Sequence, residues 1–204
     1  MWALCVNREH RMEVFKLIQG MARTDENLIQ STEELDKAID HIVQLIQDVC
    51  TLYFADSYSS SAFLSITTCE EVAKAHLGSF TDGKHLEKKG RNVFRDHKTK
   101  HAMAALPTVP MGQRLEEALG RGELQRVMNM AQNAGFVQTR ENSLYFQREK
   151  GGLVIPSEKI DKNLARSLAL FAIEVFDDAL VGMTNHSYEM DDITDALFEQ
   201  VKNT

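Results

Sequence analysis

Residues 31–54 read STEELDKAIDHIVQLIQDVCTLYF, and their apolar side chains determine the class of fold. Six of these side chains recur at steps of three and four residues, which is the repeat of one helix face: Leu35, Ala38, Ile39, Ile42, Leu45 and Ile46. Ser31 followed by Glu34 forms an S-x-x-E capping box, in which two side chains satisfy backbone N–H groups at a helix start. We therefore expect a helix from about Ser31 to Phe54.

The same helical repeat continues along most of the chain. It predicts further helices over residues 12–18, 56–80, 88–106, 112–133, 156–180 and 191–201. The helix over 112–133 contains Gly120-Arg121-Gly122, a point of low helix propensity, and is expected in one or two pieces. Because short loops between helices make neighbouring helices antiparallel, the pattern predicts an antiparallel helical bundle.

Residues 136–155 interrupt the helical repeat. Ser143–Gln147 is strand-like, Gly151-Gly152 suits a turn, and Leu153–Ile155 is a second short apolar run. The expected fold class is therefore all-α, a helical bundle with a small β-hairpin appendage. Three side chains make this hairpin more apolar than a solvated loop requires and predict a partner or dimer contact: Leu144, Phe146 and Leu153.

Length and composition describe one globular domain. The 204 residues are 43% hydrophobic and 26% charged, and 11 Gly with 3 Pro leave few turns for an all-β fold. We expect a single domain over residues 1–204, with residues 1–30 as an N-terminal extension helix. No stretch approaches 18 apolar residues, and the three scattered cysteines suit no disulfide framework, so we expect no membrane partner and a cytoplasmic location.

Residues 84–101, KHLEKKGRNVFRDHKTKH, form a basic segment in an acidic chain. They carry seven basic and two acidic residues, a net charge of +5 where the whole chain has −7. On a continuous helix, Arg91, Arg95 and Lys98 would form a cationic stripe along one face. His97 and His101 would form a neighbouring stripe of imidazoles. Guanidinium beside imidazole predicts a site that binds a phosphodiester and moves its protons.

Two other interpretations of the basic segment stay open. A basic helix in an acidic protein is most often a solvated face or an ion-pair partner of the protein's own acidic helices. His97 and His101 also have the spacing of two zinc ligands on a helix, although the glutamate of an HExxH motif and a nearby Cys pair are absent.

Three charged residues in the preceding predicted helix are candidate supporting residues. Glu71 and Lys74 lie one turn apart and are expected to form an intrahelical ion pair. Glu70 interrupts the apolar face and needs a buried cationic partner, for which Arg91 and Arg95 are the candidates. We therefore expect Glu70 to orient an arginine of the basic segment.

Four motifs in combination are similar to those of a known family. They are SAFLSITTCEEVAKAH (61–76), NVFRDHKTKH (92–101), REN-SLYF (140–146) and IPSEKI (155–160). They resemble, in this order, the E-E-x-x-K-A helix, the F-x-x-H-K-x-K element, the LY strand and the Pro-initiated final helix of AbiV-type abortive-infection proteins in the HEPN superfamily. The resemblance covers about residues 30–183.

The resemblance implies a homodimeric HEPN bundle and a ribonuclease with an R-x4–6-H motif that needs no metal or other cofactor. Two copies with five intervening residues overlap, Arg91 to His97 and Arg95 to His101, and the F-x-x-H element favours the first. The histidine would assist attack of the ribose 2′-hydroxyl on the adjacent phosphate, and the arginine would stabilise the developing charge. Three lysines are the expected RNA-binding residues: Lys88, Lys98 and Lys100.

These observations favour an antiviral effector that cuts host or phage RNA once a phage-encoded activator or the loss of an antitoxin-like protein releases it. HEPN toxins paired with nucleotidyltransferase antitoxins carry a tyrosine two residues after the histidine, whereas Thr99 follows His97 here. The alternative is a non-catalytic module that binds a phage or host protein and uses the basic segment for dimer contacts.

Overall fold

The computed structural model describes residues 27–81, 93–105 and 113–204. The expected helix over 12–18, the extension over 1–30 except for its last residues, and Lys88 and Arg91 lie outside this part of the chain. Within it the protein is all-α apart from one two-stranded antiparallel sheet, which confirms the predicted fold class. None of the described helices is long and apolar enough to cross a membrane.

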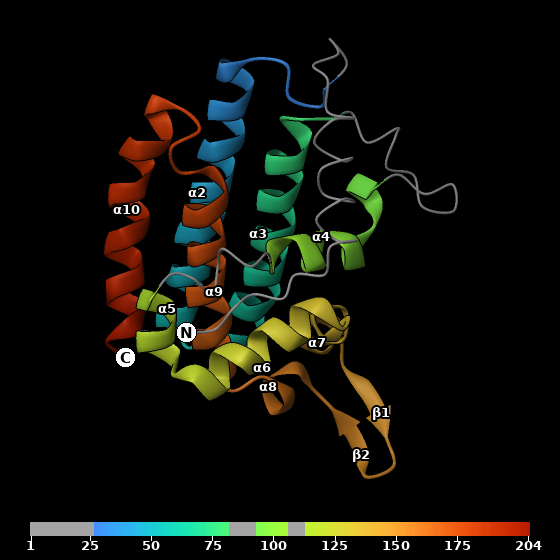
Figure 1. The fold of residues 1–204 in the computed structure, drawn as a ribbon. Helices are drawn as coiled ribbons and strands as arrows, with labels where there is room; N and C mark the ends of the chain where they lie inside the picture. The colour runs from blue at the N-terminus through green and yellow to red at the C-terminus, as the bar shows by residue number, and fades with distance from the viewer. Residues whose placement is uncertain (1–26, 82–92, 106–112) are drawn as a thin grey trace, which may run out of the picture.

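Four long helices form the main bundle: α2 (Thr32–Phe54), α3 (Tyr58–Gly78), α9 (Lys162–Leu180) and α10 (Asn185–Lys202). Figure 1 shows them side by side, with α3 and α10 on opposite sides of α2 and α9. The core between them is built from branched aliphatic and aromatic side chains that are almost fully buried, among them Ile39, Ile46, Ile66, Phe171 and Phe176. This burial supplies most of the hydrophobic stabilisation of the fold.

The start of α2 is as predicted. Ser31 is the N-cap, and its side chain accepts a hydrogen bond from the backbone N–H of Glu34 at 3.2 Å. The carboxylate of Glu34 accepts a second bond from the backbone N–H of Gln30 at 2.8 Å. These two bonds satisfy backbone donors that the helix itself leaves unpaired.

Shorter helices cover one side and one end of the bundle (Figure 1): α4 (His97–Ala104), α5 (Gln113–Leu119), α6 (Arg121–Gln132), α7 (Gly135–Leu144) and α8 (Pro156–Lys159). The expected helix over 112–133 is divided into α5 and α6 at Gly120, whose φ of 78° suits glycine. Helices α4 and α7 both pack against α3, so they bring distant parts of the chain to one of its faces.

A 3₁₀ turn, η2 (Val93–Arg95), precedes α4 and corrects the helix expected over 88–106. Asp96 between them has an extended backbone, with φ −93° and ψ 101°, so the helix begins anew at His97. The side chain of Thr99 donates a hydrogen bond back to the Asp96 carboxylate at 2.5 Å. Because the chain bends at Asp96, the stripe predicted through Arg95 and Lys98 is not a continuous helix face.

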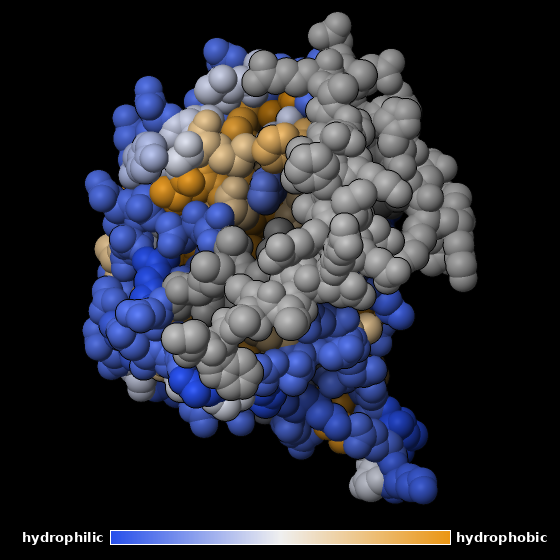
Figure 2. All heavy atoms as spheres, in the orientation of Figure 1, coloured by the Kyte–Doolittle hydropathy of each residue, from blue (hydrophilic) through white to orange (hydrophobic). Residues whose placement is uncertain are grey.

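The predicted hairpin is present but shorter and later than expected. Its strands are β1 (Gln147–Glu149) and β2 (Gly152–Val154), paired with Glu149 opposite Gly152. The strand expected over Ser143–Gln147 is wrong, because α7 occupies Gly135–Leu144. The hairpin projects from the bundle in Figure 1, and the space-filling view in Figure 2 shows mainly hydrophilic side chains at its tip.

Two expectations for the C-terminal helices are also corrected. The helix expected over 156–180 is interrupted at Ile160, and α9 begins after Asp161, whose side chain accepts a hydrogen bond from the N–H of Leu164 at 2.8 Å. The last helix begins at Asn185 and not at Asp191, because Thr184 caps it through the N–H of Ser187. In both places a capping side chain sets the helix start.

Candidate functional site

Glu70 is a buried acidic residue on the face of α3 that α4 covers. Only 4% of its side chain is exposed. A carboxylate in such a position needs several hydrogen bonds and a compensating charge to remain ionised. Helix α4 supplies both.

Three side chains of α4 bind the two carboxylate oxygens of Glu70. Nδ1 of His97 lies 2.7 Å from Oε2, and Nε2 of His101 lies 2.7 Å from Oε1. Nζ of Lys100 donates to Oε2 at 3.0 Å. Because positions 97, 100 and 101 are three or four residues apart on one helix, all three side chains leave α4 on the same side.

This arrangement keeps Glu70 negatively charged. Burial by itself raises the pKa of the Glu70 carboxyl, but the hydrogen bonds from α4 and the charge of Lys100 outweigh it and lower that pKa to about 2. The site therefore holds a fixed negative charge beneath two imidazoles at ordinary pH.

The two imidazoles have different surroundings. The side chain of His97 is 46% exposed, and its Nδ1 is bound to Glu70, which leaves Nε2 as the ring nitrogen for a substrate. His101 is fully buried, with its ring 5.4 Å from that of Phe136, and its Nδ1 has no hydrogen-bond partner among the described residues. A single proton on Nε2 of His101 satisfies both observations, because a proton on Nδ1 would be a buried unpaired donor.

The expected RNA-binding lysines and the expected arginine differ in their exposure to solvent. Lys98 and Arg95 are exposed beside His97, whereas 7% of the Lys100 side chain is exposed and its ammonium binds Glu70. Within the described residues Glu70 has its predicted cationic partner, but this partner is Lys100 and not Arg95. Glu70 thus holds two imidazoles and a lysine, and Arg91, the other expected partner, lies outside the described residues.

Glu71 and Lys74 form the predicted intrahelical ion pair. Nζ of Lys74 lies 3.0 Å from a carboxylate oxygen of Glu71, and both side chains are partly exposed. Such a pair contributes at most a few tenths of a kcal/mol to stability. Glu71 directly follows Glu70 and Lys74 lies one turn after it, but neither side chain binds the Glu70 carboxylate among the contacts of the described residues.

The geometry of His97 and His101 bears on the zinc interpretation. Both imidazoles face the same carboxylate, each through one nitrogen. Across the described ranges, no three His, Cys, Asp or Glu side chains are grouped in a way that could hold a metal ion.

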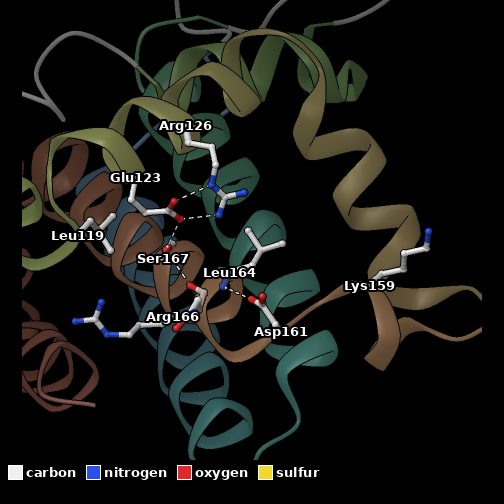
Figure 3. Close-up of a pocket in the computed structure, with 9 residues that line it drawn as sticks. Leu119, Glu123, Arg126, Lys159, Asp161, Leu164, Arg166 and Ser167 are labelled. Carbon is white, nitrogen blue, oxygen red and sulfur yellow. Dashed lines mark hydrogen bonds and ion pairs between the residues drawn. The ribbon is translucent and has the colours of Figure 1, made fainter.

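A separate cavity of about 550 Å³ lies between α6, α8 and α9. Figure 3 shows Glu123 of its lining between Arg126 and Ser167, to both of which it is hydrogen-bonded. Arg166 donates to the backbone carbonyls of Val201 and Lys202 at the end of α10. These charged groups are already used to hold helices together, so the cavity is a weaker candidate for chemistry than the Glu70 cluster.

The sequence motifs did not predict α7 or its contribution to the site. Its buried residues are Phe136, Thr139 and Ser143, so two polar side chains face inward and no apolar stripe marks the helix. Through α7 the fold places Phe136 against His101 and Arg140 over the ring of Phe63. The spacing of four residues between Phe136 and Arg140 indicates that both side chains lie on one face, if this segment is a helix.

The protein is thus an all-α bundle in which a buried glutamate of one helix is hydrogen-bonded to two histidines and a lysine of a neighbouring helix. The family model described as AbiV, of the HEPN type, matches residues 30–176. The chain therefore belongs to the AbiV family of HEPN domains and is an abortive-infection HEPN domain protein. No curated protein and no solved structure matches it.

Proposed function

We propose that this protein is an antiviral effector that cuts RNA without a metal ion. The observation that carries the proposal is the hydrogen bond between Glu70 and Nδ1 of His97, which fixes the ring and leaves Nε2 for the substrate. A buried, permanently ionised carboxylate that orients a surface imidazole is an arrangement suited to general base catalysis.

In the proposed reaction, Nε2 of His97 removes the proton from a ribose 2′-hydroxyl. The 2′-oxygen then bonds to the adjacent phosphorus, the bond from phosphorus to the 5′-oxygen breaks, and a proton from the imidazolium or from water goes to that leaving oxygen. The products are a 2′,3′-cyclic phosphate and a free 5′-hydroxyl. The negative charge of Glu70 stabilises the imidazolium that forms in the first step.

Arginine is the proposed source of charge stabilisation on the phosphate. Arg95 is exposed and lies two residues before the start of α4, and Arg91 is the partner of His97 in the first R-x5-H register. A guanidinium binds two phosphate oxygens in a planar fork, which a lysine does not reproduce. Lys98 and Lys88 then contribute sequence-independent contacts to neighbouring phosphates.

We further propose that the protein acts as a homodimer in the cytoplasm, on host or phage RNA, and that a phage-encoded activator or an antitoxin-like protein controls it. A basic segment of net charge +5 within an acidic chain can be neutralised by acidic side chains of a second copy across a two-fold interface. Light scattering that gives about 23 kDa over a wide concentration range would refute the dimer.

Purified protein incubated with total RNA tests the nuclease proposal. The wild-type chain is expected to cut RNA in the presence of a chelator, and Arg91→Ala/His97→Ala is expected to be inactive. The matched control is Arg121→Ala/His186→Ala, which removes the same two residue types from surface ion pairs with Glu116 and Asp40. Equal background cleavage from wild type and the site variant ends the proposal, and activity that a chelator removes and zinc restores supports the zinc site instead.

A non-catalytic interaction module is the second candidate, and the hairpin region favours it. Tyr145 and Phe146, which connect α7 to β1, are 61% and 70% exposed, and Leu153 of β2 is also exposed. Exposed aromatic groups of this size are typical of protein contacts. Under this function, Arg91→Ala/His97→Ala leaves phage protection intact and changes the oligomeric state.

A further inference from the structure

Arg140 on α7 has a partly buried guanidinium without a hydrogen-bond acceptor in the described structure. Its Cζ lies 5.3 Å from the centroid of the Phe63 ring on α3, so the guanidinium packs against an aromatic ring. Its Nε is buried and has no partner. No carboxylate or carbonyl of the described residues accepts a hydrogen bond from it.

The other arginines that pack against the helices have acceptors. Arg114 binds the carboxylates of Glu174, Asp177 and Asp195. Arg166 donates to three backbone carbonyls. Because buried polar groups in proteins nearly always find partners, an arginine left without one at a partly open position indicates an acceptor that comes from outside the chain.

Arg140 lies along the same face of α3 as the Glu70 cluster. Phe63 and Glu70 are seven residues apart on α3, which places them about 10 Å apart along the axis and within about 20° around it. Helix α7 runs along this face in the same way, since Phe136 contacts His101 and Arg140, one turn later, contacts Phe63. Since His97 binds Glu70 and Arg140 packs on Phe63, the two side chains contact α3 at points about 10 Å apart along its axis.

We propose that Arg140 binds a phosphate group of the RNA backbone next to the phosphate at which His97 acts. The inference rests on the proposed ribonuclease function, because it places Arg140 in the same substrate path. The guanidinium lies over the ring of Phe63, with Cζ 5.3 Å from the ring centroid, and the terminal N–H groups of an arginine can bind two phosphate oxygens. Arg140 is a substrate-binding residue, and His97 remains the residue that reacts.

RNA affinity can be measured separately from cleavage with a fully 2′-O-methylated oligonucleotide, in which the attacking hydroxyl is blocked. In fluorescence anisotropy, Arg140→Ala is expected to raise the Kd roughly tenfold and to reduce the salt dependence by about one phosphate contact. Arg140→Lys restores part of the affinity, because the charge is kept and the fork is lost. Phe63→Leu is expected to cause an intermediate loss of RNA affinity, because the aromatic ring that packs against the guanidinium is replaced by an aliphatic side chain of similar volume.

The control is Arg121→Ala, whose side chain is 88% exposed and lies on α6, not on α7. Arg140→Ala should change the melting temperature little, since the guanidinium it removes has no hydrogen-bond or ion-pair partner among the described residues and packs only against the Phe63 ring. In cleavage of unmodified RNA it should raise KM about tenfold and change kcat less than threefold.

Each result decides the inference. Unchanged RNA affinity of Arg140→Ala, or failure of the wild type to bind RNA at all, overturns it. Binding of free AMP that depends on Arg140 and equals the affinity for the oligonucleotide assigns the site to a free nucleotide and overturns the RNA contact. If the wild type binds the methylated RNA through Arg140 but cuts no unmodified RNA, the phosphate site stands and the nuclease function fails.

Discussion

His97 and His101 bind the two oxygens of one carboxylate, yet 46% of the first side chain is exposed and none of the second. One turn of α4 separates them, so α4 presents one imidazole to solvent and packs the other against Phe136. His97 can therefore be reached from solvent as it stands, whereas His101 is covered by its packing between α4, α3 and α7. This difference favours His97 over His101 in the proposed cleavage, while Arg91 of the first register lies outside the described residues.

His97→Ala should abolish RNA cleavage and leave the fold nearly unchanged. The substitution removes one hydrogen bond to Glu70 at a half-exposed position, a loss of about 1 kcal/mol, while Lys100 and His101 still hold the carboxylate. Thermal unfolding and a cleavage assay on the same preparation check this. Retained cleavage by a folded variant contradicts the assigned role of His97.

His101→Ala should act in the opposite way and lower stability. It opens a cavity beside Phe136 and removes the donor to Oε1 of Glu70, with an expected cost of about 3 kcal/mol and a drop in Tm of roughly 6–12 °C. Below the Tm of the variant, cleavage should be within a few-fold of wild type. A variant that melts normally and has lost all cleavage would instead assign catalysis to the Arg95 to His101 register.

Sequence patterning predicted the bundle because its helices carry apolar stripes or explicit caps. The α2 start at Ser31 and the Gly120 break are examples in which local residues alone determine the structure. The break at Asp96 is marked by no glycine or proline, and its local signal is weaker: an aspartate at the N-cap of α4 with Thr99 hydrogen-bonded back to it. Helix α7 was missed because Thr139 and Ser143 face inward where apolar residues would have shown the repeat.

The candidate site was predictable in composition but not in its pairings. Spacing places His97 and His101 on one side of a helix and shows that Glu70 interrupts an apolar face. It does not determine which cation covers Glu70, because Lys100 and Arg95 differ in accessibility only after the chain bends at Asp96. The distinction between a buried and an exposed histidine likewise depends on the packing of α7.

Glu70→Gln should inactivate the site and reduce stability at neutral pH. Without the carboxylate, Lys100 is left as a buried charge, at an expected cost of about 3 kcal/mol. The pKa of Glu70 is lowered in the folded state to about 2, from about 4.3 in an unfolded chain, so its ionisation stabilises the fold above about pH 4.3. The difference in stability between wild type and variant should therefore shrink as the pH falls from about 4.3 toward 2.

Urea unfolding at several pH values between 7 and 3 measures this dependence. The control is Glu71→Gln, which removes a partly exposed carboxylate paired with Lys74 on the same helix, and its effect should stay below about 0.5 kcal/mol throughout. A difference in the free energy of unfolding between wild type and Glu70→Gln that grows toward low pH contradicts the assignment of Glu70 as the stabilising ionised group.

Tyr145→Ser/Phe146→Ser should leave thermal stability unchanged, because both rings are mainly exposed beyond the end of α7. If the hairpin region is a protein contact, the same variant should lose that contact, seen as a lower dimer fraction in analytical ultracentrifugation or as lost phage protection. Its control is Tyr188→Ser, a 60% exposed tyrosine on α10. Wild-type oligomerisation together with wild-type protection assigns no contact to these rings.

Asp191→Asn should stabilise the protein above about pH 6 and have no effect near pH 4. Asp191 lies on α10 in the acidic group around Arg114, and its buried Oδ1 has no hydrogen-bond partner in the part of the chain that the structure describes. Burial, together with the charges of Asp195 and Asp177, raises the pKa of Asp191 to about 6. The folded state thus holds its proton more tightly than the unfolded chain, whose carboxyl ionises near pH 4, so ionisation destabilises the fold as the pH rises from about 4 to 6. Asparagine removes that penalty and supplies N–H donors to the neighbouring carboxylates.

Differential scanning fluorimetry should show a Tm gain of a few degrees at pH 8 that disappears near pH 4, whereas Asp192→Asn at the adjacent exposed position should show less gain at pH 8. A gain that is equal at both pH values would mean that side-chain packing, and not the charge of Asp191, limits stability at this end of the bundle.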